Sequence, residues 1–316
     1  MSNGNVTLDD LRAEIDQIDG AIHDLVMRRA ALAERIGALK DNSARVDGTA
    51  AAGAAYLRPG REATVLRRLV ARHGGSFPLP SLVRLWREIM SSLLRLQGPF
   101  SVAVLTTPEQ PGFWDVARDH YGSTTPMIAC QSAGQVLREV TEGQASVGVL
   151  PFPEEGEIAP WWPFIASARD NEPKVISRLP FVVANHNGGR GQVSAVALAR
   201  LTPEETGDDR SLLTVEMGEE LSRARLIGAL TTVGLPPIWQ ASGPAQIGQG
   251  GGLYLLEIEG FVSAEDPRLA KLAETLGSAL NRVTVLGAYP APIVTAPGVT
   301  HDEQRRVGAA AGSLRS

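Results

Sequence analysis

The sequence predicts a mixed fold, with an all-helical N-terminal part followed by a part built from both helices and strands. Apolar residues recur at steps of three and four from Thr7 to Lys40, which is the spacing of an amphipathic helix. After Pro99 the pattern changes to short runs rich in β-branched residues, separated by turn residues and short helical stretches. From Ser211 to Pro290 the predicted order is βαββαβ. At 316 residues, the chain is long enough for about two domains.

Three helices are predicted in the first part: Thr7 to Lys40, about Pro59 to His73, and Ser81 to Leu96. Thr7 and Asp10 are close to a capping box at the start of the first helix. Asn42–Ala55 is small and polar and is predicted to be a mobile loop. At about 1.5 Å per residue the first helix is about 50 Å long. Two shorter helices cannot cover a stripe of that length, so a second copy of the chain is expected to cover it.

The amino-acid composition of the chain argues against several classes of function. The net charge is −5, and no run of Lys and Arg interleaved with aromatic residues indicates nucleic-acid binding. Cys130 is the only cysteine and the five histidines show no ligand spacing, so neither a disulfide within the chain nor a metal site is expected. No cofactor is expected either. The N-terminus has no signal-peptide pattern, and no run of eighteen apolar residues occurs. We expect a cytoplasmic protein without membrane contact.

Cations interrupt the apolar stripe of the first helix. Arg12 lies four residues after Leu8, and Arg29 lies four after Leu25, so both fall on the face expected to be buried. Lys40 lies one turn beyond Ile36, on the same face. The arginines either lay their apolar stems over the core or pair with buried carboxylates. Three unmatched charges on one face also favour a bound anion.

The spacing of these cations suggests a pocket shared between chains. Arg12 and Arg29 are about 25 Å apart along the helix, too far to hold one small molecule within one chain. In an antiparallel pair of helices, Arg12 of one chain meets Arg29 of the other. Guanidinium groups bind carboxylates in a bidentate manner, so a small dicarboxylate is the expected ligand.

The N-terminal residues resemble a known family. LRAEIDQIDGAIHDLVMRRAALAERIGALK, YLRPGREATVLRRLV and RLWREIMSSLLRLQ are similar to the all-helical chorismate mutase domain over residues 7–98. The resemblance implies an intertwined homodimer that rearranges chorismate to prephenate. A pericyclic rearrangement needs no nucleophile, metal or proton shuttle, only a folded substrate and preorganised donors.

The resemblance also implies roles for individual residues. Arg29 would bind one substrate carboxylate, and Arg12 would bind the other from the partner chain. Lys40 and Gln97 would hydrogen-bond the ether oxygen, Glu62 would hold the ring hydroxyl, and Arg61 would line the site. The alternatives are that Arg61 and Glu62 form a solvated pair and that Gln97 is an ordinary helix-end residue.

The sequence departs from the family pattern at two positions. Leu93 stands where the family often has serine, and Arg58 stands where it commonly has an acidic residue. Some substrate contacts of the family are therefore expected to be missing.

In the second part, residues 99–207 resemble a truncated, degenerate prephenate dehydratase, and residues 208–292 resemble an ACT domain. Residues 293–316 are expected to form a flexible tail. FSVAVLTTPEQPGFWDVARDHYG and EGQASVGVLPFPEEGE carry the dehydratase resemblance. The family's threonine-arginine-phenylalanine motif corresponds to Ser194-Ala195-Val196, so no dehydratase activity is expected. In an alternative register the motif corresponds to Ser177-Arg178-Leu179, which keeps an arginine.

The effector motifs of the ACT-like part are altered as well. Ala224-Arg225-Leu226 and Ala241-Ser242-Gly243-Pro244 stand at their positions. The glycines from Gly248 to Gly252 lead into a strand, so they are interpreted as a hairpin turn and not as a dinucleotide-binding loop.

The first hypothesis is therefore a cytoplasmic, homodimeric chorismate mutase of phenylalanine and tyrosine biosynthesis. Its second half would be kept for dimer stability, for effector response or for contact with another shikimate-pathway enzyme. One alternative is a bifunctional chorismate mutase/prephenate dehydratase. The other is a non-catalytic regulator that binds chorismate or a partner enzyme.

Overall fold

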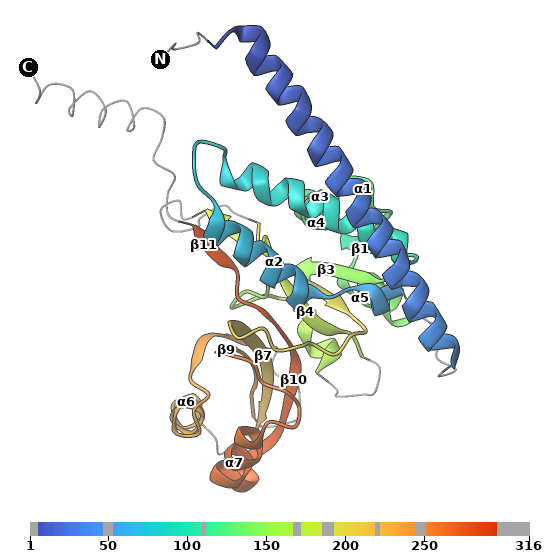
Figure 1. Ribbon diagram of the computed structural model, residues 1–316. Helices are drawn as coiled ribbons and strands as arrows, with labels where there is room; N and C mark the ends of the chain where they lie inside the picture. Colours follow the sequence, from blue (N-terminus) through green and yellow to red (C-terminus); the bar gives the residue numbers. More distant parts are fainter. Residues whose placement is uncertain are drawn as a thin grey trace, which may run out of the picture.

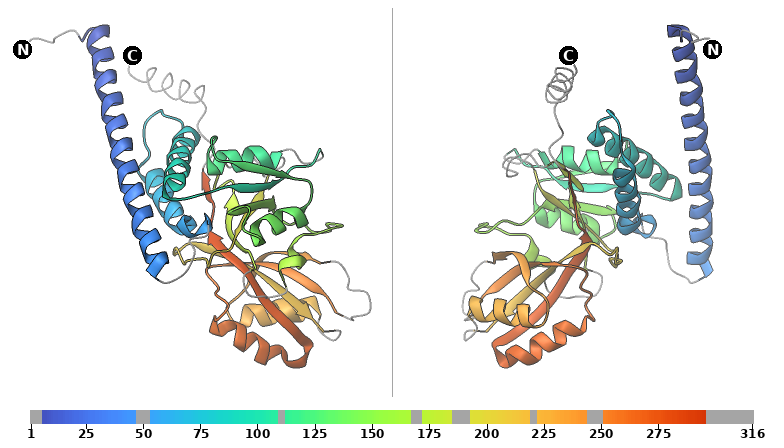
Figure 2. Two further views of the ribbon diagram at one scale, coloured as in Figure 1. Left: turned by 90° about the vertical axis from the view of Figure 1, so that its right-hand side faces the viewer. Right: turned by 60° about the vertical axis from the view of Figure 1, so that its left-hand side comes forward.

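A computed structural model describes residues 6–46, 53–108, 112–166, 172–184, 193–218, 222–243 and 251–295. A long N-terminal helix stands along one side of the molecule, with two shorter helices between it and a large mixed sheet (Figures 1 and 2). Two further helices cover the far end of that sheet, away from the N-terminus (Figure 1). The mixed class predicted from the sequence, helical first and then α and β, is confirmed.

Helix α1, Leu8–Val46, starts with the capping box that the sequence predicts. The hydroxyl of Thr7 accepts a hydrogen bond from the Asp10 backbone N–H at 3.2 Å, and Asp10 accepts one from the Thr7 backbone N–H at 2.9 Å. The Asp10 carboxylate also accepts a hydrogen bond from the Thr7 hydroxyl at 2.6 Å; this bond and the one from the Thr7 backbone N–H stabilise the charged form and lower the pKa of Asp10. Each partner thus satisfies an N–H group that the first helical turn leaves free.

The predicted loop from Asn42 to Ala55 is wrong at both ends. Helix α1 continues through Val46, and a short 3-10 helix, η1, occupies Gly53–Tyr56. Asn42–Val46 contains neither Gly nor Pro, so nothing in the local sequence stops the helix at Lys40. Residues 47–52 lie outside the described residues.

Helices α2, Pro59–Arg72, and α3, Leu79–Gln97, complete the N-terminal part. Pro59 occupies the first position of α2, where its missing N–H removes no hydrogen bond. Helix α1 packs against α3 and approaches closely at Gly37, where an added Cβ would lie 2.9 Å from the Cα of Gln97. A small core of Ala63, Leu66 and Met90 joins α2 to α3.

A single nine-stranded sheet runs through the rest of the molecule in the order β2-β1-β3-β6-β4-β10-β7-β9-β8. Its strands are β1 (Val102–Leu105), β2 (Met127–Cys130), β3 (Val147–Pro151), β4 (Lys174–Leu179), β6 (Ala195–Ala199), β7 (Asp209–Met217), β8 (Pro237–Ser242), β9 (Leu253–Glu259) and β10 (Leu280–Pro290). Strands β5 (Val182–Ala184) and β11 (Ile293–Thr295) form a separate parallel pair.

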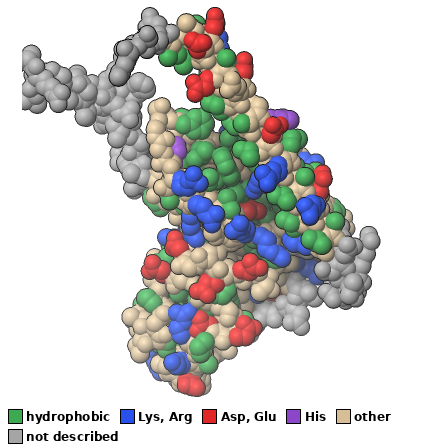
Figure 3. Space-filling view, viewed as in Figure 1, with side chains coloured by type: hydrophobic (Ala, Val, Ile, Leu, Met, Phe, Trp, Pro, Cys, Tyr) green, Lys and Arg blue, Asp and Glu red, His purple; other side chains and the backbone are tan. Residues whose placement is uncertain are grey.

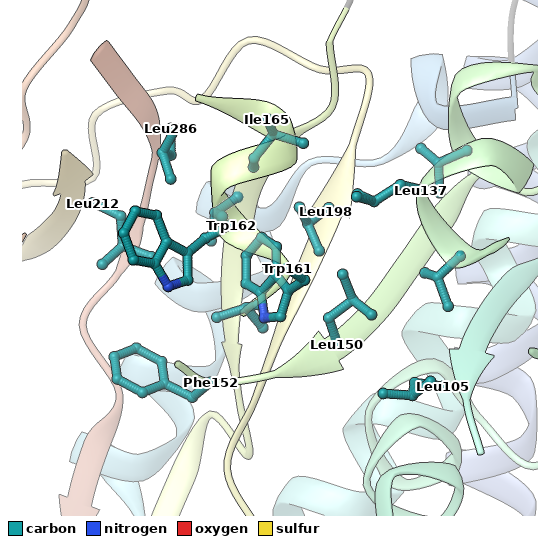
Figure 4. Packing of buried hydrophobic residues seen from close by; sticks show 14 of the residues in the cluster. Leu105, Leu137, Leu150, Phe152, Trp161, Trp162, Ile165, Leu198, Leu212 and Leu286 are labelled. Atoms are coloured by element: carbon teal, nitrogen blue, oxygen red, sulfur yellow. The ribbon is translucent and has the colours of Figure 1, made fainter. Parts of the chain in front are cut away.

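Helices α4, Gly112–Tyr121, and α5, Ala133–Thr141, cover opposite faces of the first part of this sheet. Alternate residues of β1 show the division, because Val102 and Val104 belong to the cluster under α4, whereas Ala103 and Leu105 belong to the cluster under α5. The cluster under α5 also contains Trp161 and the short 3-10 helix η2, Trp162–Ile165. These residues lie among Phe152, Leu150 and Leu198 (Figure 4).

The predicted βαββαβ order of the last part is confirmed by β7, α6 (Arg223–Thr232), β8, β9, α7 (Pro267–Leu276) and β10. Strands β8 and β9 pair antiparallel, as expected for a hairpin, although residues 244–250 of its turn lie outside the described residues. Strand β10 pairs with β7 on one side and with β4 on the other. The predicted domain boundary between residues 207 and 208 therefore falls within one continuous sheet, and this boundary stays a prediction.

The flexible tail expected from residue 293 is corrected at its start. Ile293, Val294 and Thr295 form β11, which pairs in parallel register with β5. The backbone N–H of Ile293 also donates to the carbonyl of Phe181 at 2.8 Å. This β-branched segment finds backbone partners, which composition alone did not indicate. Residues 296–316 lie outside the described residues.

Large apolar side chains remain exposed along α1 in the single chain. Figure 3 shows apolar side chains along this helix, next to those over α3. The exposed members are Leu8, Leu11, Ile15, Ile18, Ile22, Leu25, Met27, Leu32, Ile36 and Leu39. No helix among the described residues has the length and apolar character needed to cross a membrane.

Candidate functional site

The candidate site lies where the second half of α1 faces α2 and α3. Arg29, on α1, is half-buried, and its Nη1 atom is fully buried without a hydrogen-bond partner among the described residues. Burial lowers the pKa of the Arg29 guanidinium, and the negative charge of Glu62 opposes that shift. A buried donor without an acceptor is uncommon in folded proteins and marks a place where an anionic group would be stabilised.

Glu62 lies in the first turn of α2, and its side chain is only 19% exposed. Burial raises the pKa of this carboxyl, while the positive charges of Arg87 and Arg29 and a hydrogen bond from Arg87 oppose that rise. The two arginines thereby favour the charged form of the carboxylate. Glu62 is part of a buried charge network, and the solvated pair with Arg61 considered from the sequence is not what the structure shows.

Arg87 was missed by the sequence reasoning. It lies on α3, is 4% exposed, and its Nη1 donates to Oε2 of Glu62 at 2.8 Å. Its guanidinium also lies 5.5 Å from the centre of the Phe181 ring. Arg87 falls four residues after Val83 and three before Met90, so it interrupts an apolar stripe as Arg29 does. The same spacing signal that marks Arg29 therefore marks Arg87.

Gln97 is the last residue of α3 and lies where α1 comes closest. Its Nε2 donates to the backbone carbonyl of Leu93 at 3.2 Å. The side-chain amide has two N–H donors, so this bond leaves one for another acceptor. Because a Cβ at Gly37 would meet the Gln97 backbone at 2.9 Å, the missing side chain of Gly37 fixes how near the two helices approach.

Lys40 is half-buried and lies beside η1, with its Nζ 5.3 Å from the centre of the Tyr56 ring. Burial lowers the pKa of this ammonium, the positive charge of Arg58 lowers it further, and Glu204 opposes the shift. Arg58 stands where the family pattern commonly has an acid, so this chain has a repulsive neighbour of Lys40 at that position.

The other two predicted residues are exposed in the single chain. Arg61 is exposed on α2. Arg12 is exposed near the start of α1, and its Nη1 lies 3.1 Å from Oδ1 of Asp9. The rise of the helix separates Arg12 from Arg29 by about 25 Å. The described chain therefore brings Arg29 and Glu62 together, places Lys40 and Gln97 at the same end of α1, and leaves Arg12 distant.

These side chains can bind and orient an anion in a partly desolvated place. Arginine supplies a planar fork for carboxylates, lysine a point charge, and glutamine a neutral donor. In the described part of the chain, no group of three or more His, Cys, Asp or Glu residues is placed to hold a metal ion. The chemistry that this set supports is binding, orientation and electrostatic stabilisation.

In the first register considered from the sequence, the second half has no arginine at the dehydratase motif. Ala195 and Val196 are fully buried in β6, and Ser194 precedes that strand. In the alternative register, Arg178 lies on β4 and forms an ion pair with Glu257 at 3.1 Å. Ser242 of β8 donates through its backbone N–H and its hydroxyl to the carboxylate of Glu155, at 2.7 Å and 3.0 Å.

The three helices and their half-buried cations define a helical domain that can bind an organic anion. Residues 11–98 match the family model of chorismate mutase type II. The N-terminal part of the chain is thus a chorismate mutase type II domain.

Curated proteins are similar to about half of this chain. The chain is 35% identical over 149 residues to a bifunctional chorismate mutase/prephenate dehydratase of Stutzerimonas stutzeri, covering 47% of this chain and 40% of the relative. It is 36% identical over 155 residues to one of Neisseria gonorrhoeae, covering 48% and 40%. The matched region spans about two fifths of the length of these relatives.

Solved structures are only distantly similar. A prephenate dehydratase from Streptococcus mutans has a TM-score of 0.43 at 13% identity and covers 61% of this chain and 99% of its own. A quorum-quenching acylase has a TM-score of 0.45 at 17% identity and covers 60% and 95%. No conclusion on function rests on either likeness.

Proposed function

We propose that the protein is a homodimeric chorismate mutase that converts chorismate to prephenate in phenylalanine and tyrosine biosynthesis. The observation that supports this most is the half-buried Arg29, whose Nη1 has no acceptor among the described residues and which lies close to the charge of Glu62. A buried donor without an acceptor costs about 1–3 kcal/mol. A substrate carboxylate that accepts from Arg29 would remove this cost.

The exposed stripe of α1 supports the dimer. Leu25 is 64% exposed and Leu39 is 68% exposed in the single chain, although both lie on the apolar face of a helix of 39 residues. A contiguous apolar surface of this kind marks an interface. An antiparallel second copy would cover this stripe and would bring the partner's Arg12 to the Arg29 of the first chain, which completes a site with two guanidinium groups.

In this proposal each residue has one task. Arg29 and the partner's Arg12 bind the two carboxylates and hold chorismate in its folded, reactive conformer. Lys40 and the free N–H of Gln97 meet the negative charge that develops on the ether oxygen. Glu62, held by Arg87, accepts a hydrogen bond from the ring hydroxyl. Arg61 lines the opening of the site.

The second half is proposed to have no dehydratase activity. Where that activity would need an arginine, this chain has the buried, apolar Ala195 and Val196. Residues 208–292 are proposed to be an ACT-like domain, because the order β7-α6-β8-β9-α7-β10 is βαββαβ. Contact with another shikimate-pathway enzyme and a cytoplasmic location belong to the same proposal, and both follow from the proposed metabolic role.

The loss of chorismate absorbance in the presence of the purified full-length protein tests the activity. We expect turnover in the wild type and in Arg28→Ala, which removes an exposed arginine next to the site residue, and none in Arg29→Ala. A wild type that binds chorismate without consuming it would instead support a non-catalytic regulator. Formation of phenylpyruvate from prephenate would support the bifunctional alternative.

A further inference from the structure

A second cavity lies far along the chain from the mutase residues, between the end of β4, the β5–β11 pair and the start of β6. Its volume is about 270 Å³. Two arginines, Arg178 of β4 and Arg210 of β7, line it together with Ser194. The other walls are apolar and include Leu179, Val183, Val193 and Val294. None of the described residues that line this cavity is acidic.

Both arginines are anchored by one buried carboxylate. Glu257, on β9, is 2% exposed and accepts from Nη1 of Arg178 at 3.1 Å and from Nη1 of Arg210 at 3.3 Å. The hydroxyl of Tyr289, on β10, donates to the same carboxylate oxygen. These four residues come from β4, β10, β7 and β9, which are consecutive neighbours in the sheet. They therefore form a row across one face of it.

The charges in this row do not balance. Two guanidinium groups share one carboxylate, which leaves a net charge of one positive unit at the cavity. The side chains of Arg178 and Arg210 are 24% and 33% exposed. Their Nε and Nη2 atoms make no hydrogen bond to any residue that the structure describes. Donors held in place by Glu257 thus remain available at the wall of the cavity.

The position of Arg178 is fixed from a second side. Its guanidinium carbon lies 3.8 Å from the centre of the Phe152 ring, which is a stacking distance for a cation on an aromatic face. A guanidinium held by a carboxylate at one edge and by a ring on one face loses little freedom when it binds an anion. Preorganisation of this kind favours binding.

We propose that this cavity binds a small monocarboxylate with an apolar body. The carboxylate would accept hydrogen bonds from Arg178 and Arg210, and its single negative charge would neutralise the net positive charge of these residues and Glu257. The apolar body would contact the valines and Leu179. At about 30 Å³ per water molecule, the cavity has room for about nine water-sized groups, which is the size of a benzoate ion. Inorganic phosphate would leave the apolar walls without a partner. The proposal assigns binding and no turnover.

Titration calorimetry of the full-length protein with benzoate tests this site. We expect saturable binding to the wild type and no binding of the neutral analogue benzyl alcohol or of inorganic phosphate. Arg178→Gln and Arg210→Gln should each weaken binding at least about tenfold, because each removes a charge-assisted hydrogen bond. Arg225→Gln, which removes an exposed arginine of α6, is the matched control and should bind as the wild type does.

Two further variants separate this site from others and from effects on folding. Val183→Phe fills the cavity while leaving both arginines in place, and it should abolish binding without lowering the urea midpoint of unfolding. Arg29→Ala should bind benzoate unchanged, because the mutase site is not involved. The proposal is overturned if the wild type shows no saturable binding, if Arg178→Gln and Arg210→Gln bind as tightly as the wild type, if only Arg29→Ala loses binding, or if phosphate binds better than benzoate.

Discussion

Nη1 of Arg87 lies 2.8 Å from Oε2 of Glu62, and this ion pair joins α3 to α2 at the candidate mutase site. Both side chains are largely buried, with exposures of 5% and 19%. Truncating one partner of such a pair leaves the other charge buried and unpaired. In the proposed mechanism Arg87 contacts Glu62 and has no task at the substrate, so we propose that it acts as a positioning residue for Glu62.

Replacing Arg87 should therefore change both the rate and the pH profile of the mutase. Burial already raises the pKa of Glu62, and Arg87 opposes that rise, so Arg87→Gln should raise this pKa further. The carboxylate is the better hydrogen-bond acceptor, so the acidic limb of the kcat/KM profile should move to higher pH, and kcat/KM at neutral pH should fall about tenfold or more. Steady-state kinetics across the pH range measure both effects.

Arg84→Gln is the control for this prediction. Arg84 lies one turn earlier on α3, is exposed, and pairs with Asp119 at 2.6 Å. Because an exposed ion pair contributes about 0–1 kcal/mol, this variant should keep the wild-type profile. An Arg87→Gln enzyme with a lower rate but an unmoved acidic limb would show that Arg87 supports the fold only.

Arg29→Ala should abolish turnover while leaving the helices intact. Nη1 of Arg29 has no hydrogen-bond partner among the described residues, so its removal breaks no described bond of that atom. Loss of a preorganised donor to the reacting substrate costs about 10²–10³ in rate, and loss of a binding cation adds to this. Circular dichroism should show unchanged helicity. Activity close to that of the wild type would place the site elsewhere.

Mixing two inactive variants tests whether the pocket is shared between chains. In a heterodimer of Arg12→Ala and Arg29→Ala chains, one site combines both substitutions and the other has neither. Chains unfolded together and refolded as a mixture should therefore recover about one intact site per heterodimer, whereas each variant refolded alone stays inactive. If the mixture stayed inactive although heterodimers had formed, Arg12 would not act across the interface.

Two glycines of α1 should respond in opposite ways to alanine. A Cβ at Gly37 would lie 2.9 Å from the Cα of Gln97, so Gly37→Ala must push α1 away from α3 and should destabilise the protein by about 1–3 kcal/mol. It should also lower kcat, because Gln97 moves with the backbone. Gly20 has no atom within 4 Å of its added Cβ, so Gly20→Ala should stabilise the helix by about 0.5–1 kcal/mol. Urea unfolding curves compare the two.

Lys40 should set the alkaline limit of the activity. Burial lowers the pKa of Lys40, which therefore loses its proton at a lower pH than an exposed lysine does. Activity that depends on its charge is present below that pKa and is lost as the pH rises through it. Lys40→Arg should keep a cation at high pH and extend the active range upward. An alkaline limb that stays in place in this variant would assign it to another group.

The N-terminal part could be predicted from its sequence because its signals are local. The capping residues Thr7 and Asp10, the proline that opens α2 and the cations on the apolar stripe each lie within a few positions of what they specify. Arg87 was overlooked, although its spacing was equally informative. What spacing could not show is its partner, because Glu62 is 25 residues away in sequence and only the packing of α2 on α3 brings the two together.

The second half could be predicted less completely, because its decisive contacts are non-local. The βαββαβ order follows from alternating local patterns, and it is confirmed. The carboxylate shared by Arg178 and Arg210 joins residues 79 and 47 positions apart, and no local pattern reports such a meeting. The pairing of β11 with β5 is equally non-local, and the hydroxyl of Thr295 donates to the carbonyl of Val183, 112 positions away.

Strand β10 has one consequence for how this protein can be dissected. It pairs antiparallel with β7 from Leu280 to Pro290 and also contacts β4 at Gly287, so the last long strand of the sequence fills the middle of the sheet. A shortened chain that ends before Leu280 would lack this central strand. Its β4 and β7 would then each present an edge of unpaired backbone N–H and C=O groups. The sheet is therefore best produced and purified with β10 included.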